Sequence, residues 1–263
     1  MNRLLRANFI RLWKNKIFLI GLVFMFLAGS ALVLKNYQQL TVYGIPVTLE
    51  STFFDYALLI GVVSAIFCSL FIGVEYSDGT MRNKIIVGHK RLDIYFSNLF
   101  TNILVSMILC LSYLLSNIVF GIPLIGFKDF DFSKILLLFT GSMIMVIALC
   151  SIFTMISLLI QNKALPPVIC IVGMFLMIGL VSEIDRMLDQ PQYYYDNTAN
   201  PNYLEGEERE RYEFFYDFLP AGQGMQYASW KTGNISDMCL YSAGIFIVTT
   251  GIGTFFFRRK DIK

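Results

Sequence analysis

The sequence predicts an all-α integral membrane protein with six transmembrane helices, an N-terminal interfacial helix and both termini in the cytoplasm. Composition is the first reason: hydrophobic residues make up 56% of the 263 positions and charged residues only 15%, whereas a soluble domain carries about 25% charged residues. A mean hydropathy of +0.61 also excludes a disordered chain. The second reason is a set of six long apolar stretches, and the third is a one-sided distribution of basic residues.

The first 16 residues form an amphipathic pattern ahead of the first apolar stretch. On a helical wheel one face is apolar (Leu5, Phe9, Leu12, Trp13) and the other is basic (Arg3, Arg11, Lys14). This pattern predicts a helix in the membrane interface, over residues 1–16, with its bases toward anionic headgroups. The alternative is a basic flank that only sets the topology.

Six stretches approach the length of about 20 apolar residues that a membrane helix needs. They are Ile17–Leu34, Tyr56–Val74, Leu99–Phe120, Ile135–Ile160, Leu165–Val181 and Cys239–Phe257. With the N-terminus inside, the inner segments hold 14 of the 21 basic residues and 4 of the 19 acidic residues. This excess of bases predicts that both termini are cytoplasmic.

The six stretches contain no Asp, Glu, Lys, Arg or His. Proton relays and cation sites in membranes use such residues, so the sequence argues against an ion-coupled transporter and against an intramembrane hydrolase. The five cysteines form no CxxC pair, and no metal site is expected. The chain has no GxxxxGK[ST] motif, so we expect no enzyme activity of its own, and any ATP and Mg²⁺ belong on a partner subunit.

The inner segment 75–91 combines several local signals. Asp78-Gly79-Thr80 is a turn followed by a helix start, a short helix is expected from Thr80 to Val87, and Gly88 ends it. A basic loop that only sets topology would not need the Gly-Thr start or the apolar residues at 85–87. Exposed apolar residues on such a helix indicate a docking surface.

The pattern Glu75-x-x-x-Gly79-Thr80-apolar-Arg-Asn-Lys84-apolar resembles the cytoplasmic coupling segment of type-2 ATP-binding-cassette (ABC) transporter permeases. A Leu-Pro-x-Gly-Gln segment before the last span, here Leu219-Pro220-Ala221-Gly222-Gln223, is also similar to that family. The resemblance implies a single permease domain over residues 1–263, a separate ABC ATPase subunit as partner, and a second permease copy, identical or related, in a dimer.

The resemblance also implies two sets of site residues. The ATPase-docking set is Glu75, Thr80, Met81, Arg82, Lys84, Ile85 and Ile86, and Glu75 and Arg82 are expected to pair across the elbow. The substrate-cavity set is Phe67, Phe71, Met174 and Met177, because the second and fifth spans of the family line the central cavity of the dimer. Met and Phe surfaces adapt to varied apolar partners, but these positions are equally suited to a protein core or a lipid-facing surface.

Two further features have alternative interpretations. The extracellular segment 182–238 carries a net charge of −7 and an expected helix from Leu204 to Phe218; it is either an acidic vestibule for cationic cargo or a solvated cap. The third span carries a polar stripe, which either bonds neighbouring helices or lines a wet path. The stripe comprises Asn98, Thr101, Asn102, Ser106, Ser112, Tyr113, Ser116 and Asn117.

These observations predict the membrane-spanning permease of an ATP-driven exporter. The charge-free spans favour amphipathic or hydrophobic cargo. The resemblance to small permeases of this family implies a peptide, such as a bacteriocin or cytolytic toxin, ahead of lipids or drugs. The expected location is a cell membrane, crossed several times and bacterial, with membrane lipid but no nucleic acid as a partner. The alternative is a membrane sensor or assembly factor that transports nothing.

Overall fold

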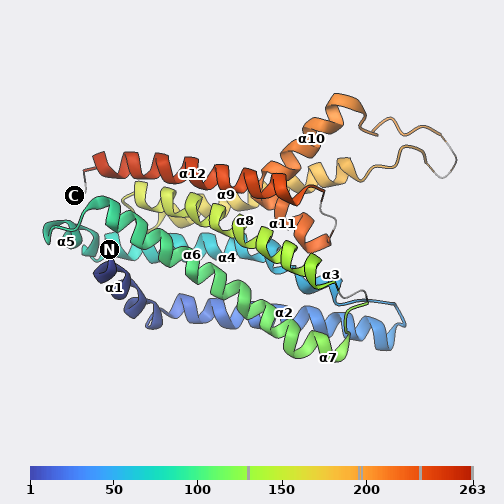
Figure 1. Cartoon of the computed structure of the whole chain (residues 1–263), viewed down its shortest axis with the longest axis horizontal. Helices are drawn as coiled ribbons and strands as arrows, with labels where there is room; N and C mark the ends of the chain where they lie inside the picture. Colours follow the sequence, from blue (N-terminus) through green and yellow to red (C-terminus); the bar gives the residue numbers. More distant parts are fainter. Residues whose placement is uncertain (129–130, 195, 197, 231–232, 262–263) are drawn as a thin grey trace.

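A computed structural model describes residues 1–128, 131–194, 196, 198–230 and 233–261. Long helices run side by side along the molecule, and helices α1 and α5 lie with both chain termini at the same end (Figure 1). The helices are α1 (Asn2–Trp13), α2 (Lys16–Val42), α3 (Glu50–Phe53), α4 (Tyr56–Ser77), α5 (Thr80–Ile86), α6 (Arg91–Ser116), a π-helical turn (Asn117–Gly121), α7 (Ile122–Leu124), α8 (Phe132–Leu159), α9 (Leu165–Leu188), α10 (Gly206–Phe218), α11 (Pro220–Ser229) and α12 (Ile235–Arg259).

Within the described residues, six helices are long and apolar enough to cross a membrane, which confirms the six predicted spans. The largest difference from the sequence prediction is in the third span, which begins eight residues earlier, at Arg91, and continues through the π-helical turn to Leu124. A search for continuous apolar residues does not detect the first turns of this helix, because polar residues such as Asn98 are buried there against other helices.

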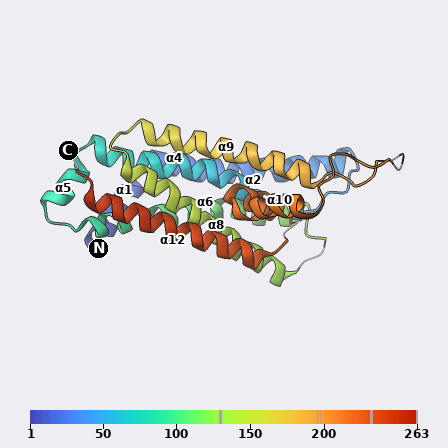
Figure 2. The same ribbon diagram turned by 90° about the horizontal axis from the view of Figure 1, so that it is seen from above.

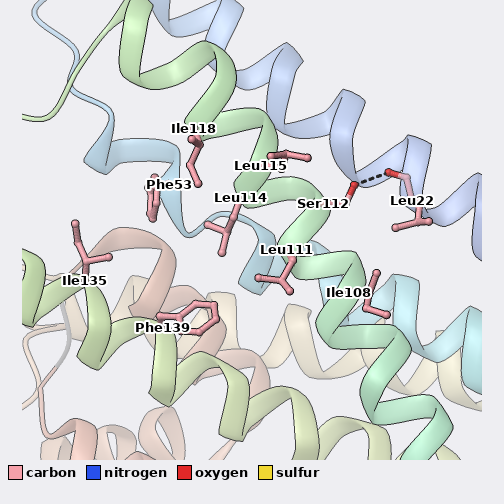
Figure 3. Close-up of a pocket in the computed structure, with 10 residues that line it drawn as sticks. All are labelled: Leu22, Phe53, Ile108, Leu111, Ser112, Leu114, Leu115, Ile118, Ile135 and Phe139. Atoms are coloured by element: carbon pink, nitrogen blue, oxygen red, sulfur yellow. Dashed lines mark hydrogen bonds between the residues drawn. The ribbon is translucent and has the colours of Figure 1, made fainter.

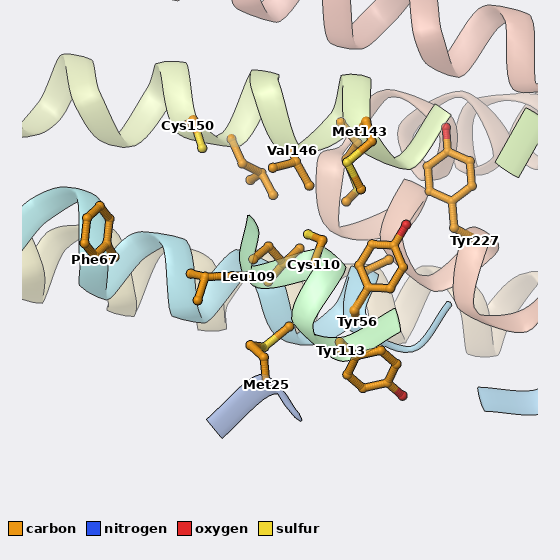
Figure 4. Close-up of a cluster of buried hydrophobic side chains, with 14 of the residues drawn as sticks. Met25, Tyr56, Phe67, Leu109, Cys110, Tyr113, Met143, Val146, Cys150 and Tyr227 are labelled. Carbon is orange, nitrogen blue, oxygen red and sulfur yellow. The ribbon is translucent and has the colours of Figure 1, made fainter. Parts of the chain in front are cut away.

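Helix α4 lies in the middle of the bundle and is covered by α2, α6, α8 and α9 (Figure 2). The core between these helices contains Tyr56, Phe67, Leu109, Tyr113 and Tyr227 among its fully or nearly fully buried side chains (Figure 4). Close packing of such side chains is one of the forces that hold membrane helices together.

Polar side chains connect the helices inside this apolar bundle. Ser64 of α4 donates to Ser106 of α6 at 2.9 Å, and Asn102 of α6 donates to Thr154 of α8 at 2.8 Å. Tyr113 donates to the carbonyl of Thr52 at 2.9 Å. The polar stripe of the third span therefore bonds neighbouring helices, as the first of its two interpretations predicted.

Helix α1 packs on the bundle through Leu4, Asn8 and Leu12, which are buried. The amide of Asn8 donates to the Ser97 carbonyl at 3.3 Å and to the Thr101 hydroxyl at 3.2 Å. The predicted basic face is wrong for Arg11, whose guanidinium donates to the Glu75 carboxylate of α4 instead of facing the headgroups. The sequence pattern could not show this, since a buried carboxylate on α4 attracts Arg11 inward.

At the opposite end of the molecule, α10 projects from the bundle and α11 turns back into it (Figure 1). The Leu-Pro-x-Gly-Gln segment forms the start of α11, where Gln223 is buried and donates to the carbonyls of Asp217 at 2.8 Å and Met238 at 3.1 Å. Ser242 of α12 donates to the Gln223 side chain at 2.7 Å. This segment therefore attaches α10 and α11 to the last span, α12.

Candidate functional site

The elbow between α4 and α5 has the local structure that the sequence predicts. Gly79 adopts φ +67, a left-handed conformation that glycine accepts without strain, and Gly88 adopts φ +93 after the helix. The Thr80 hydroxyl donates to the carbonyl of Glu75 at 3.1 Å. The short helix α5 is thus held at a defined angle to the end of α4.

A buried ion cluster lies inside this elbow. The carboxylate of Glu75 is fully buried, and its Oε1 lies 2.5 Å from both the Nη1 of Arg11 and the Nζ of Lys84. The amide of Asn98 is 3.4 Å from the other carboxylate oxygen. Glu75 therefore connects α4 to α1, α5 and α6, and we call these four residues the Glu75 cluster.

The two cations of the Glu75 cluster have different surroundings. The Arg11 guanidinium lies 3.7 Å from the centre of the Phe71 ring and also donates to the Phe71 carbonyl at 3.3 Å. Burial lowers the pKa of Lys84 from its ordinary value, and the Glu75 carboxylate partly opposes this effect. The two cations together compensate the cost of taking the Glu75 carboxylate out of water and leave the cluster with a net charge of +1.

The predicted pairing of Glu75 with Arg82 is wrong. Arg82 is exposed, and Lys84 takes the place beside Glu75. Met81, Lys84 and Ile85 share the inward side of α5 because residues three and four apart lie on one helix face. Arg82 lies outside that face. The spacing between Glu75 and Arg82 in the sequence could not show which basic residue of α5 faces the carboxylate.

The docking set divides into anchoring residues and exposed residues. Met81 is buried in a second hydrophobic cluster with Leu4, Tyr95 and Phe257, and Ile85 packs against this cluster. Ile86 and the neighbouring Val87 are 70% and 76% exposed. Thr80, Arg82 and Ile86 of the predicted set are therefore exposed and accessible to a partner, as is Val87, which follows α5.

The four predicted cavity residues are not gathered around one cavity. Phe67 and Phe71 are buried and stacked with ring centres 5.2 Å apart, and Phe67 also packs against Phe18 of α2. Met174 is buried and packs on Gly61, whereas Met177 is half-buried. Three of the four therefore belong to the core of this chain, and their role in a dimer cavity stays a prediction.

An apolar pocket of about 590 Å³ lies elsewhere, between α2, α3, α6 and α8 (Figure 3). Its single polar side chain, Ser112, donates to the carbonyl of Leu22 at 3.0 Å and is thereby satisfied. The remaining walls are aliphatic or aromatic, and Leu111 and Leu115 are about half exposed. The pocket offers contacts to an acyl chain but no group that would hold a charged ligand.

Six helices that are long and apolar enough to cross a membrane define a multi-pass membrane protein. A family model described as ABC-2 family transporter protein matches residues 4–177, which include the Glu75 cluster and α5. The chain belongs to this family and is a membrane-spanning permease component of an ABC transport system. No curated protein matched the chain.

Proposed function

We propose that this chain is one of two permease copies, identical or related, in an ATP-driven exporter of amphipathic or hydrophobic cargo such as peptides. Its bacterial cell-membrane location, with α5 and both termini in the cytoplasm, is part of the proposal. The observation that carries the proposal is the exposed apolar end of α5, Ile86 and Val87, held rigidly by the Glu75 cluster.

The Glu75 cluster supplies a route from the ATPase to the spans. The ATPase subunit, which holds ATP and Mg²⁺, contacts Ile86 and Val87 and moves α5 when it closes. Lys84 and Thr80 transmit this displacement to Glu75 and hence to α4. Arg11 and Asn98 carry it on to α1 and α6, so several helices move as one unit.

Cargo chemistry follows from the apolar character of the bundle. The predicted span interiors carry no charged residue, and the pocket of Figure 3 is apolar. The predicted apolar stretches hold no carboxylate for ion coupling, and the carboxylate of Glu75 at the end of α4 is already paired with Arg11 and Lys84, so energy from ATP is the favoured source. Phe67, Phe71, Met174 and Met177 become accessible to cargo in this scheme only when α2, α4 and α9 separate.

A pull-down experiment tests the proposal. The tagged wild-type chain should co-purify with a subunit that mass spectrometry identifies as an ATPase with Walker motifs. Ile86→Asp combined with Val87→Asp should abolish this association, because two charges would replace the apolar contact. Ile45→Asp is the matched control, since Ile45 is about half exposed in the loop at the other end of α2.

Two outcomes of the pull-down would contradict the proposal. A wild-type chain that reaches the membrane but brings down no ATPase would overturn the exporter proposal in favour of a sensor or assembly factor. Normal association in the double variant would remove Ile86 and Val87 from the docking surface.

A further inference from the structure

Helix α10 lies at the end of the molecule opposite α5 (Figure 1). Residues of α9 and α10 line an open groove there. It has a volume of about 930 Å³, and its walls are mainly apolar. Leu180, Ile184 and Met187 line it from α9, and Tyr212, Phe215 and Leu219 line it from the other side. Gly179 and Glu183 complete the lining, so a single carboxylate lies directly in an otherwise apolar groove.

The groove stays open because α10 is attached to the bundle along its other sides. Phe214 and Phe218 stack on each other, and both pack against Tyr241 of α12. The hydroxyl of Tyr216 donates to Asp185 of α9 at 2.6 Å. These contacts leave the groove wall uncovered, and Phe215 is 51% exposed.

The two segments that form the groove walls carry an excess of negative charge. Residues 183–189 and 205–217 contain nine carboxylates and three arginines. Each arginine already pairs with a carboxylate on its own helix, as Arg186 does with Glu183, Arg209 with Glu213 and Arg211 with Glu207. The excess of six carboxylates favours a cation and disfavours an anionic lipid headgroup.

We propose that the groove binds a cationic amphipathic peptide, whose apolar side chains contact Leu180, Ile184 and Phe215 and whose Lys or Arg side chains are attracted by the net negative charge of the two wall segments. The α9 wall from Gly179 to Met187 spans about 12 Å, or roughly two helical turns. Two turns of a bound helix present three or four apolar anchors at the spacing that helix-in-groove recognition uses. This inference names the cargo class of the exporter and rests on that proposed function.

A binding measurement tests the charge requirement. The probe is a fluorescent amphipathic helix of Leu and Lys, about five turns long, and its partner probe carries Gln in place of every Lys. The full-length chain is placed in phosphatidylcholine nanodiscs, and binding to empty nanodiscs is subtracted. The Lys probe should bind about tenfold more tightly than the Gln probe, and this advantage should disappear near 1 M salt, where the Debye length is about 3 Å.

Two glycines of α9 provide a matched pair for the groove itself. A Cβ added at Gly179 or at Gly173 meets no atom within 4 Å, so both positions have open space around the first side-chain atom. Gly179→Leu fills part of the groove and should weaken binding of the Lys probe about fivefold or more, whereas Gly173→Leu should leave it unchanged. Glu183→Gln should weaken binding severalfold, and Asp78→Asn, at an exposed acid at the opposite end, should not.

Equal binding of the Lys and Gln probes would overturn the charge assignment, and equal effects of Gly179→Leu and Gly173→Leu would overturn the groove. Native mass spectrometry tests for bound lipid. If the wild type retains a phospholipid that Gly179→Leu loses, and the wild type does not bind the Lys probe, the groove is a lipid site and the peptide proposal is overturned. The measurement uses the permease alone. If the chain associates with the ATPase but does not bind the peptide, only the groove proposal is rejected. If the chain binds the peptide but does not associate with an ATPase, only the exporter proposal is rejected.

Discussion

Arg11 and Glu75 are 64 positions apart in the sequence, yet the guanidinium of the first lies 2.5 Å from the buried carboxylate of the second. Lys84 reaches the same carboxylate oxygen from the other side at the same distance. Helices α1 and α5 are thus connected through one side chain at the end of α4. A displacement of α5 is therefore expected to move α1 as well.

The first prediction concerns the stability of this cluster. Glu75→Gln should lower the free energy of unfolding by about 3–5 kcal/mol, because two buried or half-buried cations lose their counter-charge. Arg82→Gln is the control, and its effect should stay within about 0.5 kcal/mol because Arg82 is exposed. Thermal unfolding of the purified protein in detergent measures both.

A double-mutant cycle measures the interaction energy between Arg11 and Glu75 within that cluster. Arg11→Met together with Glu75→Gln should be less destabilising than the sum of the two single variants, with a coupling energy of about 0.5–3 kcal/mol. Simple additivity of the two effects would contradict a direct interaction between these side chains.

The second prediction uses two glycines that differ in their surroundings. A Cβ added at Gly224 would lie 2.8 Å from the backbone oxygen of Ala57, so Gly224→Ala should push α11 away from α4 and destabilise the protein by about 1–3 kcal/mol. Gly173→Ala has open space and should be neutral or stabilising by up to about 1 kcal/mol. Comparison of the two thermal midpoints gives the answer, and equal midpoints would show that α11 does not pack as described.

The third prediction separates the core role of Phe67 from a role in cargo binding alone. Because Phe67 is buried between Phe18 and Phe71, Phe67→Ala should cost about 3–5 kcal/mol of stability and lower expression. Phe100→Ala, at a position about half exposed on α6, should change expression little. Unchanged stability in Phe67→Ala, combined with weaker cargo stimulation of the ATPase, would instead assign this residue to an open cavity.

The fourth prediction concerns pH and Lys260, just after α12. Its ammonium donates to the carbonyls of Leu158 and Leu159, and burial lowers its pKa from 10.5 to about 8. Between about pH 8 and pH 10.5 the unfolded chain therefore binds more protons than the folded chain at this residue, so this residue's contribution to stability rises with pH in that window.

Lys260→Met should remove this contribution. The difference in thermal midpoint between wild type and variant should stay constant below about pH 8 and then shift in favour of the wild type at higher pH. Parallel pH profiles for the two proteins across that range would contradict a perturbed lysine.

Several parts of the structure follow directly from the local sequence. The six spans depend on the length and composition of continuous apolar stretches, which neighbouring residues alone determine. The elbow at Gly79, helix α5 and its end at Gly88 also follow from turn and helix-end signals over a few residues. The coupling segment could be recognised for the same reason, since its characteristic residues are consecutive.

Tertiary structure alone decided what each side chain of that segment contacts. Glu75 pairs with Lys84 and Arg11 rather than with Arg82, Met81 is buried, and Val87 is exposed. These outcomes depend on how α1, α4, α5 and α6 are rotated and packed against one another, and a rotation of 100° per residue carries each side chain to a different neighbour. A buried carboxylate is stable only when it is paired with a cation. Packing decides which cations lie within reach, and these can be far from the carboxylate in the sequence.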